Sequence, residues 1–299
     1  MTRRLKPPGW NVLGLLPAHV IMLLTLIVPV GIIILVSFST RGPYGGFDYV
    51  FTTAPYKQIL FNEGWTGELE FNPQYLIVVA RTLILSLVTT FICLLLSFPV
   101  AYFISLQRPA LKVGLIYLVT LPFWVSMIVR VYSWIIILGN DGVIAKALRA
   151  LGLVENMGSL LFGDTAMLIG LVYSYIPLMI LPIFASIEKL DPTLVEASHD
   201  LYGSRLITLR RVILPLCQPG MLAGSILVFV PCLGAVLEPT LLGGGKTMMM
   251  GNLIQLQFGA ARNWPLGAAI SIVLMAAVLI FLVSRGLRAI RRESRELGK

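Results

Sequence analysis

The hydrophobic residues of this chain fall into long continuous runs that are separated by shorter polar stretches. A helix needs about 20 consecutive apolar residues to cross the hydrocarbon core of a bilayer. Runs of that length recur along the sequence and predict about six membrane-spanning helices. We expect these spans near residues 13–38, 75–106, 113–138, 166–187, 220–242 and 265–284.

The composition agrees with a membrane protein. Of the 299 residues, 57% are hydrophobic and 12% are charged, and the mean hydropathy is +0.88. In soluble domains about a quarter of the residues are charged, so an ordinary globular protein is excluded. The first apolar run is too long for the core of a signal peptide and is not followed by a small-residue cleavage site. It therefore predicts an uncleaved first span.

Lysine and arginine gather in alternate loops, which sets the orientation. The positive-inside rule places the richer set in the cytoplasm and accounts for the net charge of +9 without nucleic acid. This set includes both termini, a loop at 188–219 and a basic tail at 285–299. The fold class predicted is an all-α membrane protein with both termini cytoplasmic, forming one transmembrane domain over residues 1–299. Outside, residues 40–74 should form an ordered cap, and residues 140–158 should hold a short amphipathic helix.

A polar and basic segment, residues 195–221, separates the fourth and fifth predicted spans. Just before it, Asp191 can cap a helix whose first position is a proline. Gly203 permits a turn, and a second helical run should then end at Pro215. The pattern predicts two short helices that lie outside the membrane between two spans.

This segment resembles the EAA loop of type I ABC-importer permeases. The family pattern is Glu-Ala-Ala, a glycine, a hydrophobic-Leu-Pro and then Pro-Gly. Two positions depart from it: Ser198 replaces the second alanine, and Tyr202 stands where the family usually has glycine, with Gly203 one position late. The matching residues are Glu196, Ala197, Leu201, Gly203, Ser204, Val212, Leu214, Pro215, Pro219 and Gly220.

Further segments between residues 75 and 284 resemble the spermidine/putrescine permease subgroup. They include Leu-Pro-Phe-Trp at 121–124 and Arg-Asn-Trp-Pro at 262–265. The resemblance implies half of a pathway for a small solute, most of all a polyamine, in the bacterial inner membrane and in contact with lipid. It also implies a second permease subunit, an extracytoplasmic solute-binding protein and two cytoplasmic ATPase subunits that hold ATP and Mg. Permeases of this subgroup also occur beside binding proteins for other solutes, so a different solute is an alternative.

Glu238 is the one acidic residue predicted inside a span, where a charge is expensive and should face a cavity or a partner. Arg130 lies at a similar predicted depth, so the two can form a structural pair. The alternative is that Glu238 helps to receive a cation. Tyr173, Tyr175 and Trp134 fit an aromatic belt at the membrane interface, but they can also line a pathway, because aromatic faces bind ammonium groups.

The sequence contains no catalytic constellation and no metal-ligand spacing. Residues 243–247 include Gly-Lys-Thr but lack the earlier glycine of a P-loop, so no cofactor is expected on this chain. ATP hydrolysis is therefore expected on a separate subunit, and the chain itself is not expected to be an enzyme. The competing interpretation, an ion-coupled secondary transporter, predicts paired intramembrane acids or an inverted repeat. The sequence offers one buried acid and no clear repeat.

Overall fold

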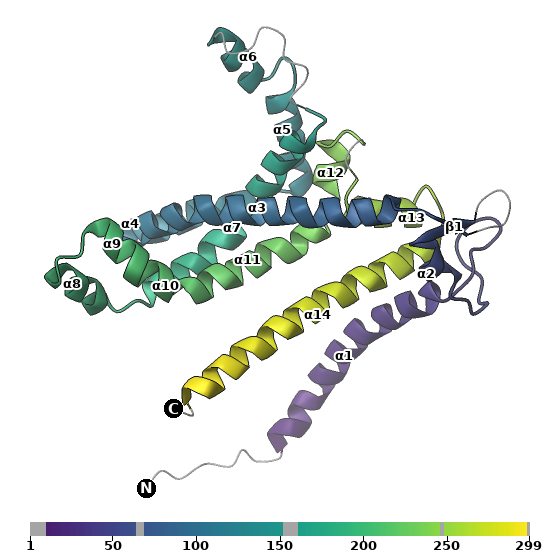
Figure 1. Cartoon of the computed structure of the whole chain (residues 1–299), viewed down its shortest axis with the longest axis horizontal. Helices are drawn as coiled ribbons and strands as arrows, with labels where there is room; N and C mark the ends of the chain where they lie inside the picture. Colours follow the sequence, from purple (N-terminus) through teal and green to yellow (C-terminus); the bar gives the residue numbers. More distant parts are fainter. Residues whose placement is uncertain (1–9, 64–68, 152–160, 246–247, 298–299) are drawn as a thin grey trace. The chain divides into compact units, whose positions relative to one another are not determined.

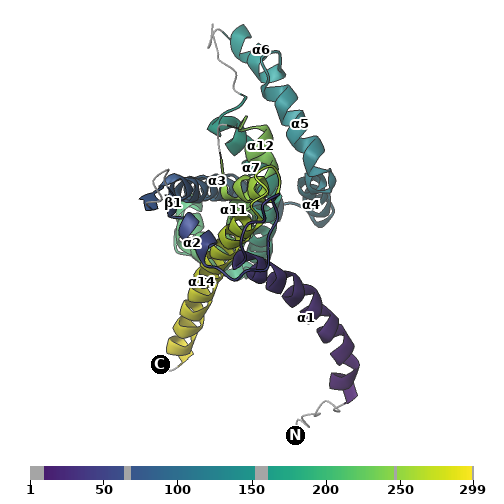
Figure 2. The same cartoon turned by 90° about the vertical axis from the view of Figure 1, so that its right-hand side faces the viewer.

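The computed structural model describes residues 10–63, 69–151, 161–245 and 248–297. It is helical apart from one small two-stranded sheet, as Figures 1 and 2 show. The chain packs as two compact units, each described by itself below. The first comprises Met1–Pro73 and Ile254–Lys299, and the second comprises Gln74–Leu253.

The first unit is built on two long helices, α1 (Trp10–Ser37) and α14 (Trp264–Leu297), which pack against each other. After α1 come a short helix, α2 (Ala54–Gln58), and an antiparallel hairpin of β1 (Phe61–Glu63) and β2 (Leu69–Phe71). The Tyr56 hydroxyl lies 2.8 Å from the Ser37 hydroxyl and ties α2 to the end of α1. The described part of the predicted cap is thus ordered, while residues 64–68 lie outside the described residues.

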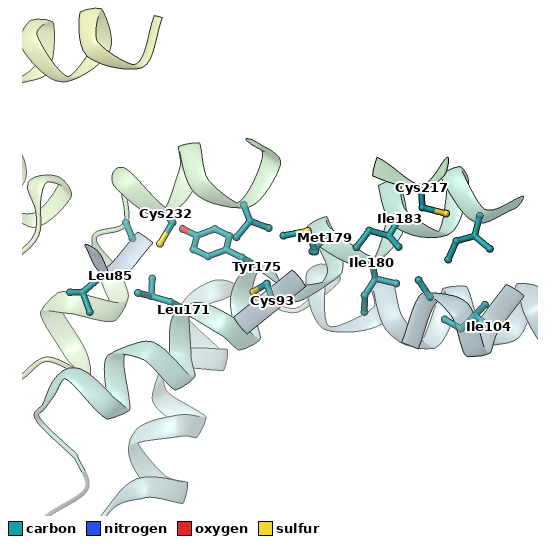
Figure 3. Close-up of a cluster of buried hydrophobic side chains, with 14 of the residues drawn as sticks. Leu85, Cys93, Ile104, Leu171, Tyr175, Met179, Ile180, Ile183, Cys217 and Cys232 are labelled. Carbon is teal, nitrogen blue, oxygen red and sulfur yellow. The ribbon is translucent and has the colours of Figure 1, made fainter. Parts of the chain in front are cut away.

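The second unit is organised around three helices that lie side by side in both views: α3 (Gln74–Ser105), α7 (Asp164–Glu188) and α11 (Gln218–Leu233). Figure 3 shows their buried side chains meeting along the length of α7. Gly224 of α11 allows a close approach, because a β-carbon there would lie 2.8 Å from the Met179 sulfur. The cluster includes Leu85, Cys93, Ile104, Leu171, Tyr175, Met179, Ile183, Val228 and Cys232.

The remaining elements of the second unit are shorter. They are α4 (Pro109–Trp124), α5 (Met127–Leu138), α6 (Val143–Ala150), α8 (Pro192–Asp200), α9 (Arg205–Thr208), the π-helical turn η1 (Leu209–Ile213), α10 (Leu214–Leu216) and α12 (Leu237–Leu241). One more helix, α13 (Met250–Phe258), contains the boundary between the two units in the sequence, at Leu253 and Ile254. The amphipathic helix predicted within residues 140–158 is α6, and residues 152–160 lie outside the described residues.

Among the described residues, five helices are long and apolar enough to cross a membrane. A sixth candidate is the pair Arg205–Leu216 and Gln218–Leu233, which bends by 63° at its break. The prediction of about six spans therefore agrees with the number of candidate helices. The bounds of α1, α3 and α7 also lie within a few residues of the predicted spans.

Two predicted spans are not continuous helices. The expected helix at 113–138 is interrupted at Val125 and Ser126, whose extended backbone (ψ 138° and 133°) separates α4 from α5. The expected helix at 220–242 stops at Leu233, and only the short α12 follows before residue 242. Each break follows a proline by two or three residues, Pro122 in α4 and Pro231 in α11. Proline disturbs the turn that precedes it, and both helices continue for two residues beyond their proline, so the proline alone does not account for the break.

Candidate functional site

The loop between α7 and α11 begins as the sequence predicted. Asp191 has an extended backbone (φ −68°, ψ 119°), and its carboxylate accepts a 3.0 Å hydrogen bond from the Thr193 backbone N–H. This bond lowers the pKa of the Asp191 carboxyl, because it favours the charged form. Pro192 then occupies the first turn of α8, where a missing N–H has no intrahelical partner to lose. The helix start predicted at Asp191 is confirmed.

The turn after α8 depends on both Tyr202 and Gly203, in different ways. Tyr202 takes the left-handed conformation (φ +58°), which costs a residue with a β-carbon roughly 1–2 kcal/mol. Gly203 has no positive φ, but its N–H donates a 2.8 Å hydrogen bond to the Ser198 carbonyl. A β-carbon at Gly203 would lie 2.7 Å from the Ser198 hydroxyl. Gly203 is thus needed for close approach, whereas the unusual backbone angle falls on the tyrosine.

Ser198, the other departure from the family pattern, joins the two short helices. Its hydroxyl lies 2.9 Å from the hydroxyl of Thr208, which is buried at the end of α9. The His199 ring nitrogen Nδ1 lies 3.0 Å from the Gly203 carbonyl oxygen and adds a second contact across the turn. These contacts fix the position of α8 relative to α9.

The second helical run includes Pro215 and stops at Leu216, one residue beyond the end that the sequence predicts. Within this run, the Leu214 N–H bonds to the Leu209 carbonyl in the wider π-helical turn. A wider turn accommodates Pro215, because the carbonyl that its ring would otherwise crowd is displaced. The chain bends at Cys217 instead, between α10 and α11.

The loop is firmly joined to the three-helix core. A β-carbon at Gly220, in the first turn of α11, would lie 2.6 Å from the Pro182 carbonyl of α7, so the two helices touch there. At the end of α7, Glu188 forms a 2.6 Å ion pair with Lys112 of α4. Among the other predicted loop residues, Glu196, Ala197, Leu201, Ser204 and Pro215 are exposed, and Leu214 is half-buried. The arrangement leaves one face of the loop free while its ends are packed.

The second candidate site contains two buried charged residues. Glu238 on α12 has no exposed surface, and Arg130 on α5 is 9% exposed. Both carboxylate oxygens of Glu238 lack a hydrogen-bond partner, as do the Arg130 nitrogens Nε and Nη1. The two side chains lie within electrostatic range of each other, but they form no ion pair in the described structure. The structure therefore places Arg130 and Glu238 near each other, but the two side chains do not form the predicted ion pair.

The remaining surroundings of Glu238 come from α7. A β-carbon at Gly170 would lie 3.4 Å from Glu238 Cγ, and Ser174, one turn further along α7, faces the carboxylate. The burial of Glu238 is produced by the chain's own helices. The carboxylate is thus closed off from solvent and from any pathway along the surface of the chain.

The aromatic candidates divide into two groups. Trp134 of α5 and Tyr173 of α7 are half-buried, and their rings meet edge to face with centroids 5.5 Å apart. Tyr175 is buried on another side of α7, where its hydroxyl donates a 3.4 Å hydrogen bond to the Pro231 carbonyl. Figure 3 shows its ring pointing towards Cys232 in the core. Trp134 and Tyr173 are accessible in this state, whereas Tyr175 is a core residue.

Sequence reasoning missed two buried hydroxyls on α3. Ser86 and Thr89 have no exposed surface, and their oxygens lack hydrogen-bond partners with good geometry. Both lie near Cys232, which in turn lies near Glu238. Small polar residues within an apolar run are the only signal that marks them in the sequence. Among the described residues, no group of three or more His, Cys, Asp or Glu side chains could hold a metal ion.

Residues 94–296 match the family described as binding-protein-dependent transport system inner membrane component. The chain is 37% identical over 269 residues to the spermidine/putrescine transport system permease protein PotB of Haemophilus influenzae, covering 89% of this chain and 90% of that protein. It is 36% identical over 262 residues to the PotB protein of Escherichia coli, covering 88% and 91% of the two chains.

A solved structure with a similar fold belongs to a bacterial ABC transporter involved in the import of the acidic polysaccharide alginate. Its TM-score is 0.72 at 16% identity, with 95% of this chain and 96% of that chain covered. The fold is therefore that of an ABC-importer permease, as predicted. The chain belongs to the family of binding-protein-dependent transport system inner membrane components, which confirms the resemblance found around Glu196 and makes it a multi-pass membrane transport component rather than an enzyme.

Proposed function

We propose that this chain is a permease subunit of an ABC importer that takes up polyamines of the spermidine/putrescine class. The observation that carries the proposal is the similarity to two spermidine/putrescine permeases over nearly the full length of all three chains. The alginate transporter supports only the fold, because its sequence identity to this chain is low.

The accessible aromatic residues offer a first contact for a polyamine. Trp134 and Tyr173 present half-buried rings, and ammonium groups bind to aromatic faces. Glu238 supplies a buried carboxyl group that could pair with an ammonium group, but it is covered by α5 and α7. We therefore propose Trp134 and Tyr173 as the first contacts for the solute, and Glu238 as a group that the solute reaches only when α12 moves away from α7.

The complete transporter would contain a second permease subunit, an extracytoplasmic solute-binding protein and two cytoplasmic ATPase subunits that hold ATP and Mg. A structure related to this chain is described in complex with a pentasaccharide-bound periplasmic protein, which supports the binding-protein partner. The loop at residues 188–219 is the proposed contact for the ATPase. It is packed at both ends and free on one face, so a push on α8 would reach α7 and α11.

Uptake of radiolabelled spermidine tests this function in cells that lack their own polyamine importers and express the complete transporter. Excess unlabelled putrescine should compete with the labelled solute, whereas excess of a neutral sugar should not. A transporter that assembles but takes up no polyamine, while its binding protein retains another solute, would assign the chain to that solute instead.

A further inference from the structure

An ion pair ties α4 to α7 at the end of α7 where the loop of residues 188–219 begins. The Nζ atom of Lys112 lies 2.6 Å from the Oε1 atom of Glu188, and only 19% of the lysine side chain is exposed. The described residues form one other ion pair, in which Arg81 of α3 contacts Asp164, the first residue of α7. Each end of α7 is therefore held by an ion pair to a different helix.

Both charges of the Lys112–Glu188 pair stand against the dipoles of their own helices. Glu188 is the last residue of α7, where the partial charge of the helix end is negative, and Lys112 lies in the first turn of α4, where it is positive. Each charge alone is unfavourable for its own helix. The contact between α4 and α7 compensates both, because the opposite charge and the opposite helix end meet there.

Glu188 lies where a displacement of the loop would enter the second unit. It is three residues before Asp191, which caps α8. Lys112 belongs to α4, which packs against α3 as well as α7. A displacement of this end of α7 can therefore reach α4 through the ion pair.

The far end of α4 is a break in the helix. Val125 and Ser126 have extended backbone, and α5 leaves α4 there at a marked angle (Figures 1 and 2). Beyond the break, α5 packs against α7 and α12 and carries Trp134, whose ring meets that of Tyr173 on α7. A bend at this break would move Trp134 relative to Tyr173 without unfolding either helix.

We propose that Lys112 and Glu188 are positioning residues that make α4 move together with the loop end of α7, so that bending occurs at Val125 and Ser126. This inference rests on the proposed function, because an ATPase has to displace the loop. The bend moves α5 and thereby opens the aromatic contact that the solute meets first. Without the ion pair, α7 would move past α4, and ATP hydrolysis would no longer open this contact.

The ratio of ATP hydrolysed to spermidine imported tests this proposal in proteoliposomes that hold the complete transporter. Lys112→Gln and Glu188→Gln should each lower uptake at least about fivefold, while the ATP hydrolysis stimulated by the binding protein stays within about twofold. Arg108→Gln is the matched control, because it removes an exposed cation just before α4 and should leave the ratio unchanged. An unchanged ratio in both pair variants would overturn the proposal.

Exchange of the two charges separates the ion pair from a contact of Glu188 with the ATPase. The double variant Lys112→Glu, Glu188→Lys keeps the pair with reversed signs, and each charge then suits the dipole of its own helix. It should restore the ratio of the original chain, whereas Lys112→Glu alone should not. Loss of ATPase retention in Glu188→Gln would overturn the proposal, as would an unrestored ratio in a double variant that inserts and retains the ATPase normally.

Spin labels measure the bend directly in the complete transporter. Cysteines that replace Leu118 of α4 and Ile136 of α5, both exposed, carry the labels. ATP binding should change the distance between the labels in the original chain and leave it unchanged in Glu188→Gln, and an equal change in both would contradict the proposal. A solute other than spermidine would abolish spermidine uptake in every variant but would leave this distance change intact, so failure of the proposed substrate is distinguishable.

Discussion

The hydroxyls of Ser198 and Thr208 lie 2.9 Å apart and join α8 to α9 across the turn at Tyr202. The serine stands where the family pattern has an alanine, and Thr208 is buried beneath it. An alanine could not make this contact. The loop of this chain is therefore closed by a side-chain bond that the family pattern does not require.

Ser198→Ala should loosen this loop without unfolding the protein. A hydrogen bond of this kind contributes about 1 kcal/mol, so the amide hydrogens around Gly203 should exchange about fivefold faster. Hydrogen exchange of the purified transporter measures this directly. Ser225→Ala is the matched control, because the Ser225 hydroxyl bonds only within its own helix, to the Met221 carbonyl. Equal exchange in Ser198→Ala and the original chain would show that the bond contributes nothing.

Gly203→Ala should damage the loop more severely. The new β-carbon would lie 2.7 Å from the Ser198 hydroxyl and closer still to its carbonyl, so the turn must open. We expect at least about a tenfold loss of ATPase retention during purification, while the amount of inserted permease stays near normal. Gly114→Ala in α4 is the control, because a β-carbon there meets no neighbour. Full ATPase retention in Gly203→Ala would show that this turn is not needed for ATPase docking.

Glu238→Gln should impair uptake without destabilising the protein. The buried carboxylate forms no ion pair and no hydrogen bond of good geometry, although Ser174 faces it, and an unpaired buried charge is itself costly. The unfolding midpoint should therefore stay unchanged or rise. If Glu238 receives an ammonium group, the apparent KM for spermidine should rise about tenfold, because a charged hydrogen bond contributes about 1.5 kcal/mol or more.

The control for Glu238→Gln is Glu70→Gln, which neutralises an exposed acid in β2. It should leave the unfolding midpoint and the apparent KM for spermidine unaltered. A fall in stability that Arg130→Met reverses in the double variant would favour the structural pair over the cation site. Normal uptake in Glu238→Gln would exclude the acid from the pathway.

The orientation predicted from charge can be tested by labelling single cysteines. A cysteine at Thr193, exposed at the start of α8, should react only from the cytoplasmic side, and one at Tyr49 only from outside. The native residues Cys93, Cys217 and Cys232 are buried and should not react with a polar reagent. Labelling of both sites from the same side would contradict the positive-inside assignment.

The lengths of the apolar runs were enough to predict where most spans lie, because bilayer thickness fixes the length of a helix that crosses it. They could not predict the breaks at Ser126 and Gly234. Hydrophobicity is similar in a straight helix and in a broken one, and a proline near a helix end is compatible with either. The elements that follow the two breaks, α5 and α12, pack against each other and against α7, and single-sequence patterns do not contain such contacts.

In the loop between α7 and α11, too, some features can be predicted from the sequence and others cannot. The helix start at Asp191 follows from local chemistry, since a capping carboxylate and a following proline act within three residues. The continuation through Pro215 does not, because it requires the wider turn of η1. The pattern also assigned the turn to Gly203, whereas the left-handed residue is Tyr202, and the need for glycine at 203 comes from its close approach to Ser198.

The most direct test of this account is spermidine uptake into proteoliposomes that hold the complete transporter. With binding protein outside and ATP trapped inside, labelled spermidine should accumulate, and removal of either should stop it. Gly203→Ala in this chain should abolish accumulation, while Gly114→Ala should preserve it. Accumulation driven by an ion gradient without ATP, or undiminished accumulation with Gly203→Ala, would contradict a permease that receives its energy through this loop.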